Sequence, residues 1–370
     1  MKKVLFLIYK LVGGGAEKVL VDIVNHMDHT LYEVTVMTVA DCSADAHLLN
    51  SHIKYEYIFK GKWKEDRIFF KLFHQASPQF LHDLFVKKKY DVEIAALEGI
   101  PAKIISGCKH LHTKKIAFIH ADANNIAWPS KRYKNSLQEY ESYNSYDHLI
   151  FVSNHSKKSF IEKFNIELSK TVTLYNPFDF QQIKMKALER VDDYKKTTNY
   201  LFCAVGRLDK VKGFDRLIEA FHIVHKKFNQ MSLIIIGEGK EKDILLRKIA
   251  KYKLNHKITL LGYQTNPYKY LKMSDCYICS SFSEGLSSTV IEAMILGVPV
   301  IATDCGGMDE LLGEYKNGVI VNNETEALMN GIEQFLSEIG ESNEKDEEGS
   351  MHHLQKFSYN HYFDKIVKMM

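Results

Sequence analysis

The sequence has no hydrophobic run long enough to cross a membrane. The apolar stretch Val4–Tyr9 ends at Lys10, whereas a spanning helix needs roughly 20 residues. Lys2 and Lys3 precede this stretch, as basic residues do in a signal peptide, but Lys10 interrupts it after six residues, and three glycines and Glu17 follow. We therefore interpret Val4–Tyr9 as a buried first strand and expect a cytoplasmic protein.

The chain is also poor in patterns that bind metals or form disulfides. Its six cysteines lie mostly in apolar, strand-like stretches. Cys276 and Cys279 form a Cys-x-x-Cys pair, but thiols three positions apart in a strand point to opposite faces, so we interpret both as buried hydrophobic residues. No Asp-x-Asp motif occurs, and no His/Cys cluster, including His352-His353, has metal-site spacing. We expect no metal and no cofactor.

Strong charge of one sign is absent as well. The formal net charge is +3, with 25 Lys and Arg against 20 Asp and Glu in residues 1–185, and 24 against 26 in the remainder. This asymmetry is too mild to indicate a nucleic-acid partner. A hydrophobic fraction of 45% and a length of 370 residues are typical of a globular protein with two domains.

Strand-like and helix-like segments alternate in two series along the chain. Several of the strand-like segments are continuous apolar runs, which is typical of parallel strands buried on both faces. The pattern predicts two parallel α/β units whose ligands bind at the carboxyl ends of the strands, in a cleft between the units. The expected strands are residues 4–9, 34–39, 91–96, 115–119, 148–152, 200–205, 232–236, 258–261, 276–280 and 298–302, and the expected helices are 16–27, 156–164, 214–226, 240–252 and 289–296.

A polar stretch, residues 186–198, separates the two series. We predict that it is a linker between a first domain, 1–185, and a second domain, 199–356. Residues 338–348 are strongly acidic and polar, which indicates a solvated loop.

A glycine-rich loop, Gly13-Gly14-Gly15-Ala16-Glu17-Lys18, lies between the first strand and the first helix. Glycines allow a ligand to approach the backbone, and a helix N-terminus offers unpaired N–H groups. Lys18 occupies the third glycine position of the dinucleotide fingerprint, although Asp41 resembles its ribose-binding acid. A nicotinamide-dependent oxidoreductase and a tight turn without a ligand both remain open for this loop.

Two further loops carry charged residues at the ends of strands in the second series. Arg207 and Lys212 lie in Gly206–Gly213, just before a helix, where two cations suit a diphosphate; ordinary solvated charges are the alternative. Glu284 precedes a helix, and Glu292 lies eight residues later on an apolar helix face, where a carboxylate requires a partner. Glu292 suits the hydroxyls of a ribose, and a structural ion pair is the alternative.

Together these motifs resemble glycosyltransferase family 4, the retaining "glycosyl transferases group 1", which has the GT-B fold of two Rossmann-like domains. The resemblance covers nearly the whole chain, and the motifs occur in the family's order. Further matches are Ile119-His120, Phe151-Val152-Ser153, Asn176-Pro177, Cys305-Gly306-Gly307 with Glu310, and Phe357-Ser358-Tyr359. The resemblance implies that residues 357–370 pack back on the first domain.

The resemblance also implies a role for each matched residue, and a catalytic set of His120, Glu284, Arg207 and Lys212. Arg207 and Lys212 would hold the donor diphosphate, and Glu292 would hold the ribose. Glu284, with the amides of Gly285, Leu286 and Ser287, would contact the transferred sugar and the distal phosphate. Gly14 and Gly15 would line the diphosphate or acceptor side, and His120 would lie beside the reacting sugar. By position alone, a histidine at the end of an apolar strand is more often a core or capping residue, and only its place in the Ile119-His120 motif favours the functional role.

Residues 60–89 combine eight Lys and Arg with six large aromatic side chains. Such a segment is typical of a surface that contacts an anionic membrane, and equally of a helix whose aromatic residues pack in the core. Since many family members act on lipid-linked acceptors, peripheral contact with the inner face of the cell membrane remains open.

We therefore expect a metal-independent, retaining transferase. It would move a hexose or N-acetylhexosamine from a nucleotide diphosphate sugar, UDP-linked by expectation, to a glycan or lipid-linked acceptor in cell-surface polysaccharide synthesis. The alternatives are a nucleotide-sugar 2-epimerase of the same fold, a nicotinamide-dependent oxidoreductase and a catalytically silent binding subunit.

Overall fold

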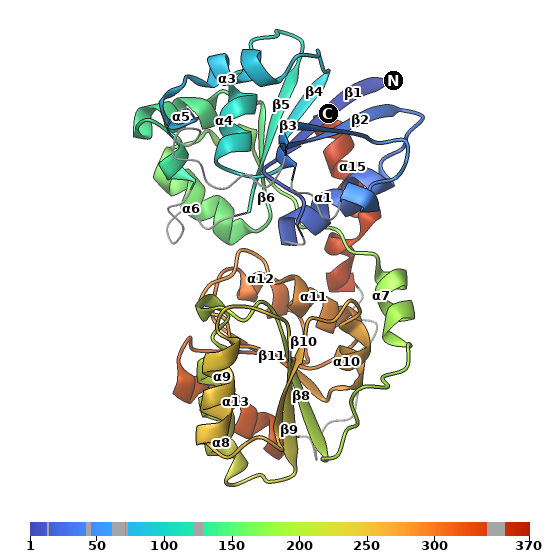
Figure 1. Cartoon of the computed structure of the whole chain (residues 1–370), viewed down its shortest axis with the longest axis vertical. Coiled ribbons are helices and arrows are strands. Elements are labelled where there is room, and N and C mark those ends of the chain that lie inside the picture. The colour runs from blue at the N-terminus through green and yellow to red at the C-terminus, as the bar shows by residue number, and fades with distance from the viewer. Residues whose placement is uncertain (13–14, 42–45, 61–70, 72, 121–128, 339–351) are drawn as a thin grey trace. The chain divides into compact units, whose positions relative to one another are not determined.

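The computed structural model describes the chain except for residues 13–14, 42–45, 61–70, 72, 121–128 and 339–351. The chain forms two compact units (Figure 1). The first unit comprises Met1–Pro177 and Asn360–Met370, and the second comprises Phe178–Tyr359. Each unit contains one parallel sheet, which confirms the predicted α/β class.

The sheet of the first unit has seven strands in the order β3-β2-β1-β4-β5-β6-β7. Every adjacent pair is parallel, so all the strands end at one edge, called the carboxyl edge below. The strands are β1 Lys2–Ile8, β2 Tyr32–Asp41, β3 Lys54–Lys60, β4 Val92–Ala95, β5 Lys114–Ile119, β6 His148–Phe151 and β7 Thr171–Thr173. The α-helices are α1 Gly15–His26, α3 Pro78–Phe85, α4 Ile100–Ser106, α5 Ser136–Asn144, α6 Asn154–Phe164 and α15 Tyr359–Met369.

The sheet of the second unit has six parallel strands in the order β10-β9-β8-β11-β12-β13. The strands are β8 Tyr200–Val205, β9 Met231–Ile236, β10 Ile258–Gly262, β11 Cys276–Cys279, β12 Val300–Thr303 and β13 Gly318–Val321. The α-helices are α7 Phe180–Ala187, α8 Phe214–His225, α9 Lys242–Lys251, α10 Tyr268–Met273, α11 Ser288–Ile295, α12 Met308–Leu312 and α13 Thr325–Glu338.

Strand β1 shows why the apolar runs predict central strands. Val4 and Phe6 belong to one buried cluster, with residues of α1 and α15, whereas Leu5 and Leu7 belong to another, with residues of α4. Successive side chains of a strand point to opposite faces, so a strand covered by helices on both sides is apolar throughout.

The last helix, α15, belongs to the first unit although the second unit precedes it in the sequence. Tyr362, Ile366 and Met369 are buried in the same cluster as Phe6 and Ile23. Just before this helix, residues 355–357 form a short 3-10 turn in the second unit.

The division between the units falls after Pro177, and residues 186–198 lie along the second unit. Helix α7 includes 186 and 187 and packs against α10 and α11. Tyr270 donates a hydrogen bond of 2.6 Å to Asp193, and Lys196 lies 2.6 Å from Asp275. These contacts attach the stretch that the sequence marks as polar to the surface of the second unit.

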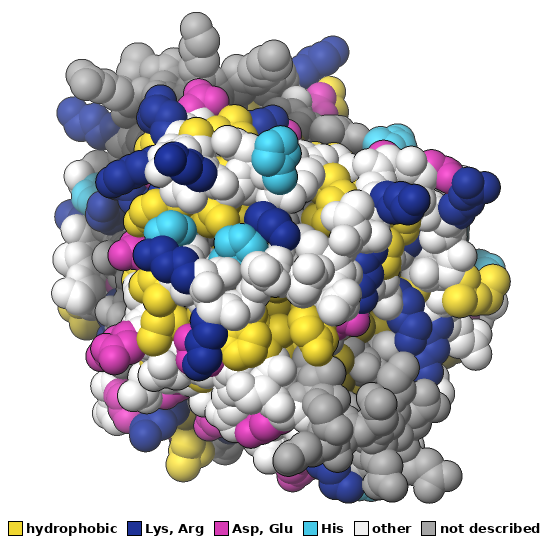
Figure 2. All heavy atoms as spheres, turned by 90° about the horizontal axis from the view of Figure 1, so that it is seen from below, with side chains coloured by type: hydrophobic (Ala, Val, Ile, Leu, Met, Phe, Trp, Pro, Cys, Tyr) yellow, Lys and Arg dark blue, Asp and Glu magenta, His cyan; other side chains and the backbone are white. Residues whose placement is uncertain are grey.

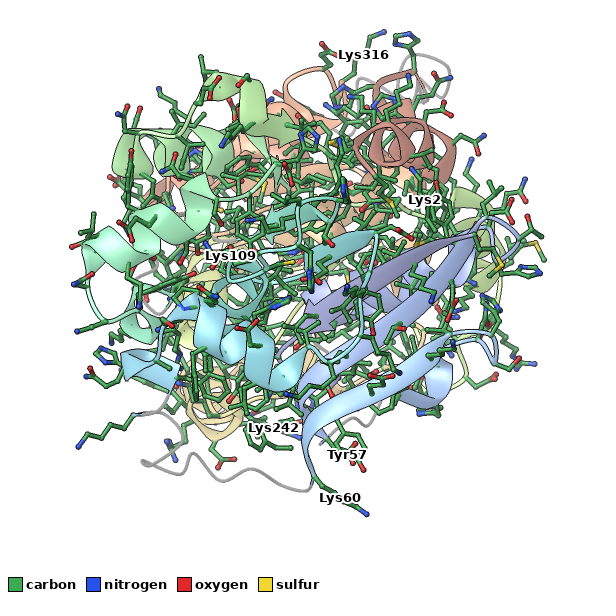
Figure 3. All side chains as sticks on the ribbon, turned by 90° about the horizontal axis from the view of Figure 1, so that it is seen from above. Lys2, Tyr57, Lys60, Lys109, Lys242 and Lys316 are labelled. Carbon is green, nitrogen blue, oxygen red and sulfur yellow. The ribbon has the colours of Figure 1, made fainter. Side chains whose placement is uncertain are left out.

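The predicted strands and helices are all present, with shifts of a few residues at their ends. Other elements were not predicted, among them β3 and α13. Strand β3 lies at an edge of the sheet and alternates charged with aromatic residues, and Lys60 at its end points away from the sheet (Figure 3). None of the helices in the described residues has the length and hydropathy that a membrane crossing requires.

The aromatic residues of segment 60–89 divide between core and surface where the structure describes them. Phe73 is buried and stacks on Phe85 with 5.7 Å between ring centroids, whereas Phe80 is 52% exposed. Trp63, Phe69 and Phe70 lie outside the described residues. On the face of the molecule drawn in Figure 2, Lys and Arg side chains are interspersed with acidic and hydrophobic ones.

Candidate functional site

An ion pair between Lys212 and Glu284 lies at the carboxyl edge of the second sheet. Lys212 follows β8, Glu284 follows β11, and these strands are neighbours, so their loops meet. Lys212 Nζ donates to Glu284 Oε1 at 2.6 Å, and Ser281 Oγ donates to the same oxygen at 2.5 Å. The two charged side chains are only 24% and 11% exposed. The pair is therefore held in place before any ligand arrives.

Lys212 stays protonated in this environment. Burial lowers the pKa of its ammonium, but the attraction and hydrogen bond of Glu284 outweigh burial, so that the pKa is raised. The site thus presents a permanent cation at neutral pH.

Two glycines allow the loops around this pair to pack closely. A Cβ atom at Gly213, where φ is +62°, would lie 2.2 Å from the carbonyl oxygen of Ser280. A Cβ atom at Gly306, where φ is +37°, would lie 1.7 Å from the carbonyl oxygen of Glu284. Any side chain at either position would push the loops apart. Gly306 of the Cys305-Gly306-Gly307 motif therefore allows its own loop to pack directly against the backbone of the Glu284 loop.

Arg216 also holds these loops, and sequence analysis did not identify it. Its guanidinium is buried and donates to the carbonyls of Ser280 and Ser281 at 2.7–2.9 Å and to that of Asn323 at 3.1 Å. Its Cζ also lies 3.8 Å from the centroid of the Phe282 ring. The available signal was a basic residue in the first turn of a helix, followed by the apolar pair Leu217-Ile218. Arg216 positions the Glu284 loop and is not itself presented to a ligand.

Arg207 lies on the same loop as Lys212 in a different environment. Its side chain is 83% exposed and lies 3.3 Å from Asp209. Asp209 in turn accepts a hydrogen bond from the backbone N–H of Lys212 at 3.3 Å, which stabilises the turn. Of the two cations assigned to the diphosphate, Lys212 is therefore partly buried and paired with Glu284, whereas Arg207 is exposed.

Glu292 lies on the buried face of α11, as its apolar neighbours predicted. It is 8% exposed, and Tyr268 of α10 donates a hydrogen bond to its Oε1 at 3.2 Å. A tyrosine hydroxyl is a neutral hydrogen-bond partner for this carboxylate. Gly285, Leu286 and Ser287 precede α11 directly, where the helix begins with unpaired N–H groups.

In the first unit, His120 and the start of α1 lie together at the carboxyl edge of the sheet. His120 follows β5, and its backbone N–H donates to Glu98 Oε1 at 2.6 Å. His120 and Ala16 line the same small depression in the surface. Gly15 begins α1, and an added Cβ there would meet no atom of the described residues within 4 Å. Gly14 lies outside the described residues.

The thiols of Cys276 and Cys279 have different surroundings, as predicted for opposite faces of a strand. Cys276 belongs to the apolar core of the second unit, whereas Cys279 Sγ lies 3.7 Å from Ser281 Oγ. All the cysteines in the described part of the chain are buried and free of disulfides.

Family models match both halves of the chain. Residues 13–182 match the model described as Glycosyltransferase Family 4, and residues 186–350 match Glycosyl transferases group 1. Between them the two matches include the glycine-rich loop, the Arg207–Lys212 loop and both glutamates.

Individual proteins that are similar to this chain are also glycosyltransferases by name or share its fold. An uncharacterized glycosyltransferase of Methanocaldococcus jannaschii is 36% identical over 205 residues, which are 52% of this chain and 50% of that protein. The N-acetylgalactosamine-N,N'-diacetylbacillosaminyl-diphospho-undecaprenol 4-alpha-N-acetylgalactosaminyltransferase of Campylobacter jejuni is 28% identical over 359 residues, 91% of each chain. The solved structure of Anabaena HepE in complex with UDP-glucose superposes with a TM-score of 0.79 at 20% identity, covering 100% of this chain and 99% of that one. That likeness confirms the two-domain GT-B fold.

Proposed function

Because the chain belongs to the family 4, group 1 glycosyltransferases, we propose that it transfers a hexose or N-acetylhexosamine from a UDP-sugar to a glycan or lipid-linked acceptor. The choice of donor is supported by HepE, whose structure contains UDP-glucose. The choice of acceptor is supported by the Campylobacter relative, whose name specifies a diphospho-undecaprenol-linked acceptor.

The observation that carries the proposal is the Lys212–Glu284 pair at the carboxyl edge of the second sheet. Ligands of parallel sheets bind at this edge, and the ammonium of Lys212 is held 2.6 Å from Glu284. A donor diphosphate would meet a cation that needs no reorganisation. Glu284 uses Oε1 for Lys212 and Ser281, so its Oε2 is the oxygen that would accept from a sugar hydroxyl.

Such a site would accelerate the reaction as the donor bond breaks. The bond between the anomeric carbon and the phosphate oxygen gives its electron pair to the leaving diphosphate, whose negative charge grows. Lys212, exposed Arg207 and the N–H groups at the start of α11 would stabilise that charge more in the transition state than in the ground state. They would supply the positive potential that a divalent cation supplies in other transferases.

Glu292 would recognise the ribose of the donor. Both carboxylate oxygens accept hydrogen bonds, which suits the neighbouring 2′- and 3′-hydroxyls of a ribose. Tyr268 holds one of these oxygens at 3.2 Å and thereby fixes the orientation of the carboxylate.

We further propose that transfer retains the anomeric configuration. Inversion needs a base behind the anomeric carbon, and the site residues assigned above leave none for that task. In retention, the leaving phosphate takes the proton of the acceptor hydroxyl on the same face, so that a new glycosidic bond forms without a protein nucleophile. His120 would lie beside the reacting sugar. Proton NMR of the first product tests this: an α-linked donor gives an α-linkage, and a β-linkage would refute retention.

We also propose that the first unit contacts a membrane through the basic segment 60–89. Attraction to anionic lipid is worth about 1 kcal/mol for each nearby Lys or Arg. Co-sedimentation with vesicles should rise with the anionic lipid content and fall with salt. A failure to bind anionic vesicles at low salt would refute the membrane contact and would not affect the proposed donor site.

A panel of nucleotide sugars tests the function as a whole. The purified chain is incubated with UDP-, GDP-, ADP- and dTDP-sugars, and thermal stabilisation and release of the nucleotide are measured. We expect one UDP-sugar to stabilise the chain most and to be hydrolysed slowly without an acceptor. Stabilisation by NAD or NADP instead, with no response to any nucleotide sugar, would contradict the proposal.

A further inference from the structure

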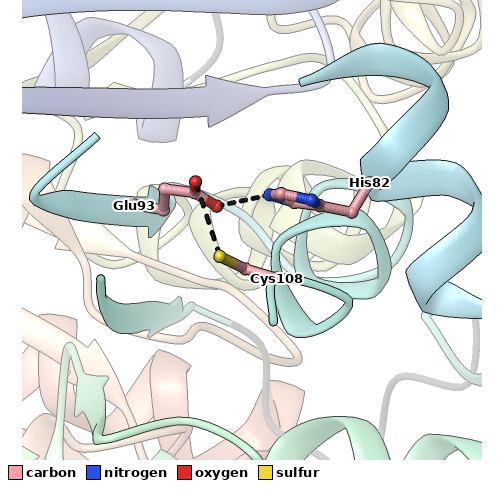
Figure 4. Close-up of side chains that lie close together, drawn as sticks. All are labelled: His82, Glu93 and Cys108. Atoms are coloured by element: carbon pink, nitrogen blue, oxygen red, sulfur yellow. Dashed lines mark hydrogen bonds and ion pairs between the residues drawn. The ribbon is translucent and has the colours of Figure 1, made fainter. Parts of the chain in front are cut away.

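Three side chains that commonly bind metals meet in the interior of the first unit (Figure 4). His82 comes from α3, Glu93 from β4, and Cys108 from the segment after α4. His82 Nε2 lies 2.9 Å from Glu93 Oε2, and Cys108 Sγ lies 3.7 Å from Glu93 Oε1. Their potential ligand atoms all lie within 4.8 Å of one another.

The cluster lies away from the proposed reaction site. Helix α4 returns from the carboxyl edge of the sheet to the opposite edge, and Cys108 comes just after its end. His120 lies at the carboxyl edge, beyond the last residue of β5. A ligand bound at the cluster would therefore stabilise the unit and would take no part in the transfer.

The charge of Glu93 is the reason to seek a ligand here. Its side chain is 0% exposed and lies on a central strand, where a carboxylate requires a compensating positive charge. His82, 2.9 Å away, supplies that charge when it is protonated, and a bound cation would supply it while leaving the imidazole neutral. A divalent cation bound by one carboxylate, one thiolate and one neutral imidazole gives a net charge of zero. The cluster thus contains the set of groups that balances a divalent cation in a buried site.

The types and spacing of the donor atoms favour zinc. Tetrahedral zinc bonds of about 2.0–2.3 Å to nitrogen, oxygen and sulfur place neighbouring ligand atoms roughly 3.4–3.6 Å apart. In the structure, His82 lies 2.9 Å from Oε2 of Glu93, Cys108 lies 3.7 Å from Oε1, and one ligand atom from each of the three residues lies within 4.8 Å of the others, which is close enough for one ion to contact all three after small side-chain shifts. A thiolate and an imidazole select zinc over calcium or magnesium, which prefer oxygen ligands only.

We propose that His82, Glu93 and Cys108 bind a structural Zn²⁺ ion, with His110 as the fourth ligand. His110 is exposed, and its ring centroid lies 6.2 Å from that of His82, so a rotation of its side chain would close the site. Asp83 Oδ1 lies 3.8 Å from His82 Nδ1, where a carboxylate would orient the imidazole. Binding deprotonates the Cys108 thiol and releases its proton to solvent.

This proposal replaces the expectation that no His/Cys cluster would form. The three residues lie 11 and 15 positions apart and match no metal-binding spacing in the sequence. Only the packing of α3 and α4 on β4 brings them together.

Metal content and spectroscopy of the full chain test the proposal. After expression with added zinc and exhaustive dialysis, mass spectrometry should find about one zinc ion per chain. Cys108→Ser should reduce the zinc content at least about tenfold, although serine can still donate a hydrogen bond to Glu93. Cys203→Ser, at a buried cysteine of the second unit, serves as the control and should retain the metal.

Cobalt provides a test that needs no variant. Co²⁺ exchanged into the wild-type chain should give the near-ultraviolet thiolate charge-transfer band and the strong visible bands of tetrahedral cobalt. If the wild-type chain holds no zinc and shows no such bands, the proposal is wrong, and the cluster is a hydrogen-bonded network. Equal zinc in the wild-type and Cys108→Ser chains would also overturn it, because the metal would then lie elsewhere.

Discussion

Replacement of Lys212 by methionine separates the two roles of this residue, in folding and in turnover. Methionine keeps an apolar stem but removes the ammonium, so Glu284 loses its partner at 2.6 Å and keeps Ser281 at 2.5 Å. The side chains are 24% and 11% exposed, so the loss lies between that of a surface pair and that of a fully buried one. We expect unfolding to become easier by about 1–3 kcal/mol.

The loss of turnover should exceed the loss of stability. Removal of one preorganised group that stabilises charge in a transition state typically lowers kcat by about 10²–10³, or about 2.7–4 kcal/mol. Lys227→Met is the matched control, because Lys227 pairs with Glu333 at 3.1 Å on the surface, with the lysine 64% exposed. We expect the control to cost less than about 1 kcal/mol of stability and to leave kcat unchanged.

A double-mutant cycle distinguishes the two roles further. Glu284→Gln makes the buried partner neutral, so Lys212→Met with Glu284→Gln should recover part of the stability that Lys212→Met loses. The rate should stay low in the double variant, because the cation is still missing. Denaturant unfolding and steady-state kinetics of all four chains give both quantities. Recovery of the wild-type rate in the double variant would contradict a catalytic role of Lys212, since Lys212 would then serve only to neutralise Glu284.

Three further predictions concern the donor, metals and pH. The wild-type chain should strongly prefer a UDP-sugar over its 2′-deoxy analogue, and Glu292→Ala should abolish that preference; equal kcat/KM for both donors in the wild-type chain would contradict the ribose role. Turnover should survive a brief excess of chelator and should not rise with added Mg²⁺ or Mn²⁺, whereas loss on chelation and restoration by Mg²⁺ would show a catalytic metal. Burial lowers the pKa of Lys103 to about 8, which is below the pKa of a lysine in the unfolded chain. Above pH 8 the unfolded chain therefore binds more protons than the folded chain, and the free energy of unfolding should rise from about pH 8 to 10. Lys103→Met should remove this rise in the unfolding free energy and should also destabilise the fold, since Lys103 donates to three carbonyl oxygens.

The fold was predictable because its central strands are buried on both faces. Val4–Ile8 is apolar at every position, since alternate side chains enter the two clusters on either side of the sheet. Strands at the edge lack this signal. In β3, Lys54, Glu56 and Lys60 interrupt the pattern, because one face of an edge strand meets solvent.

The candidate site was predictable as a set of loops but not as a set of contacts. Gly213, Glu284 and Glu292 stand out by residue type and position in the sequence. The pairing of Lys212 with Glu284 depends on β8 and β11 being neighbours, although 72 residues separate the two side chains. Arg216 was missed because a charged residue in a helix usually faces solvent, whereas here it binds the carbonyls of the loop below.

The binding of UDP, measured by titration calorimetry, tests the assignment of the donor site without requiring the sugar or the acceptor. We expect UDP to bind the wild-type chain and Lys212→Met to weaken this binding about 10- to 150-fold, the value of a charge-assisted hydrogen bond to the diphosphate. Uridine, which lacks the diphosphate, should bind both chains equally. No binding of UDP to the wild-type chain, or equal affinity of both chains for UDP, would contradict the assignment of the donor site.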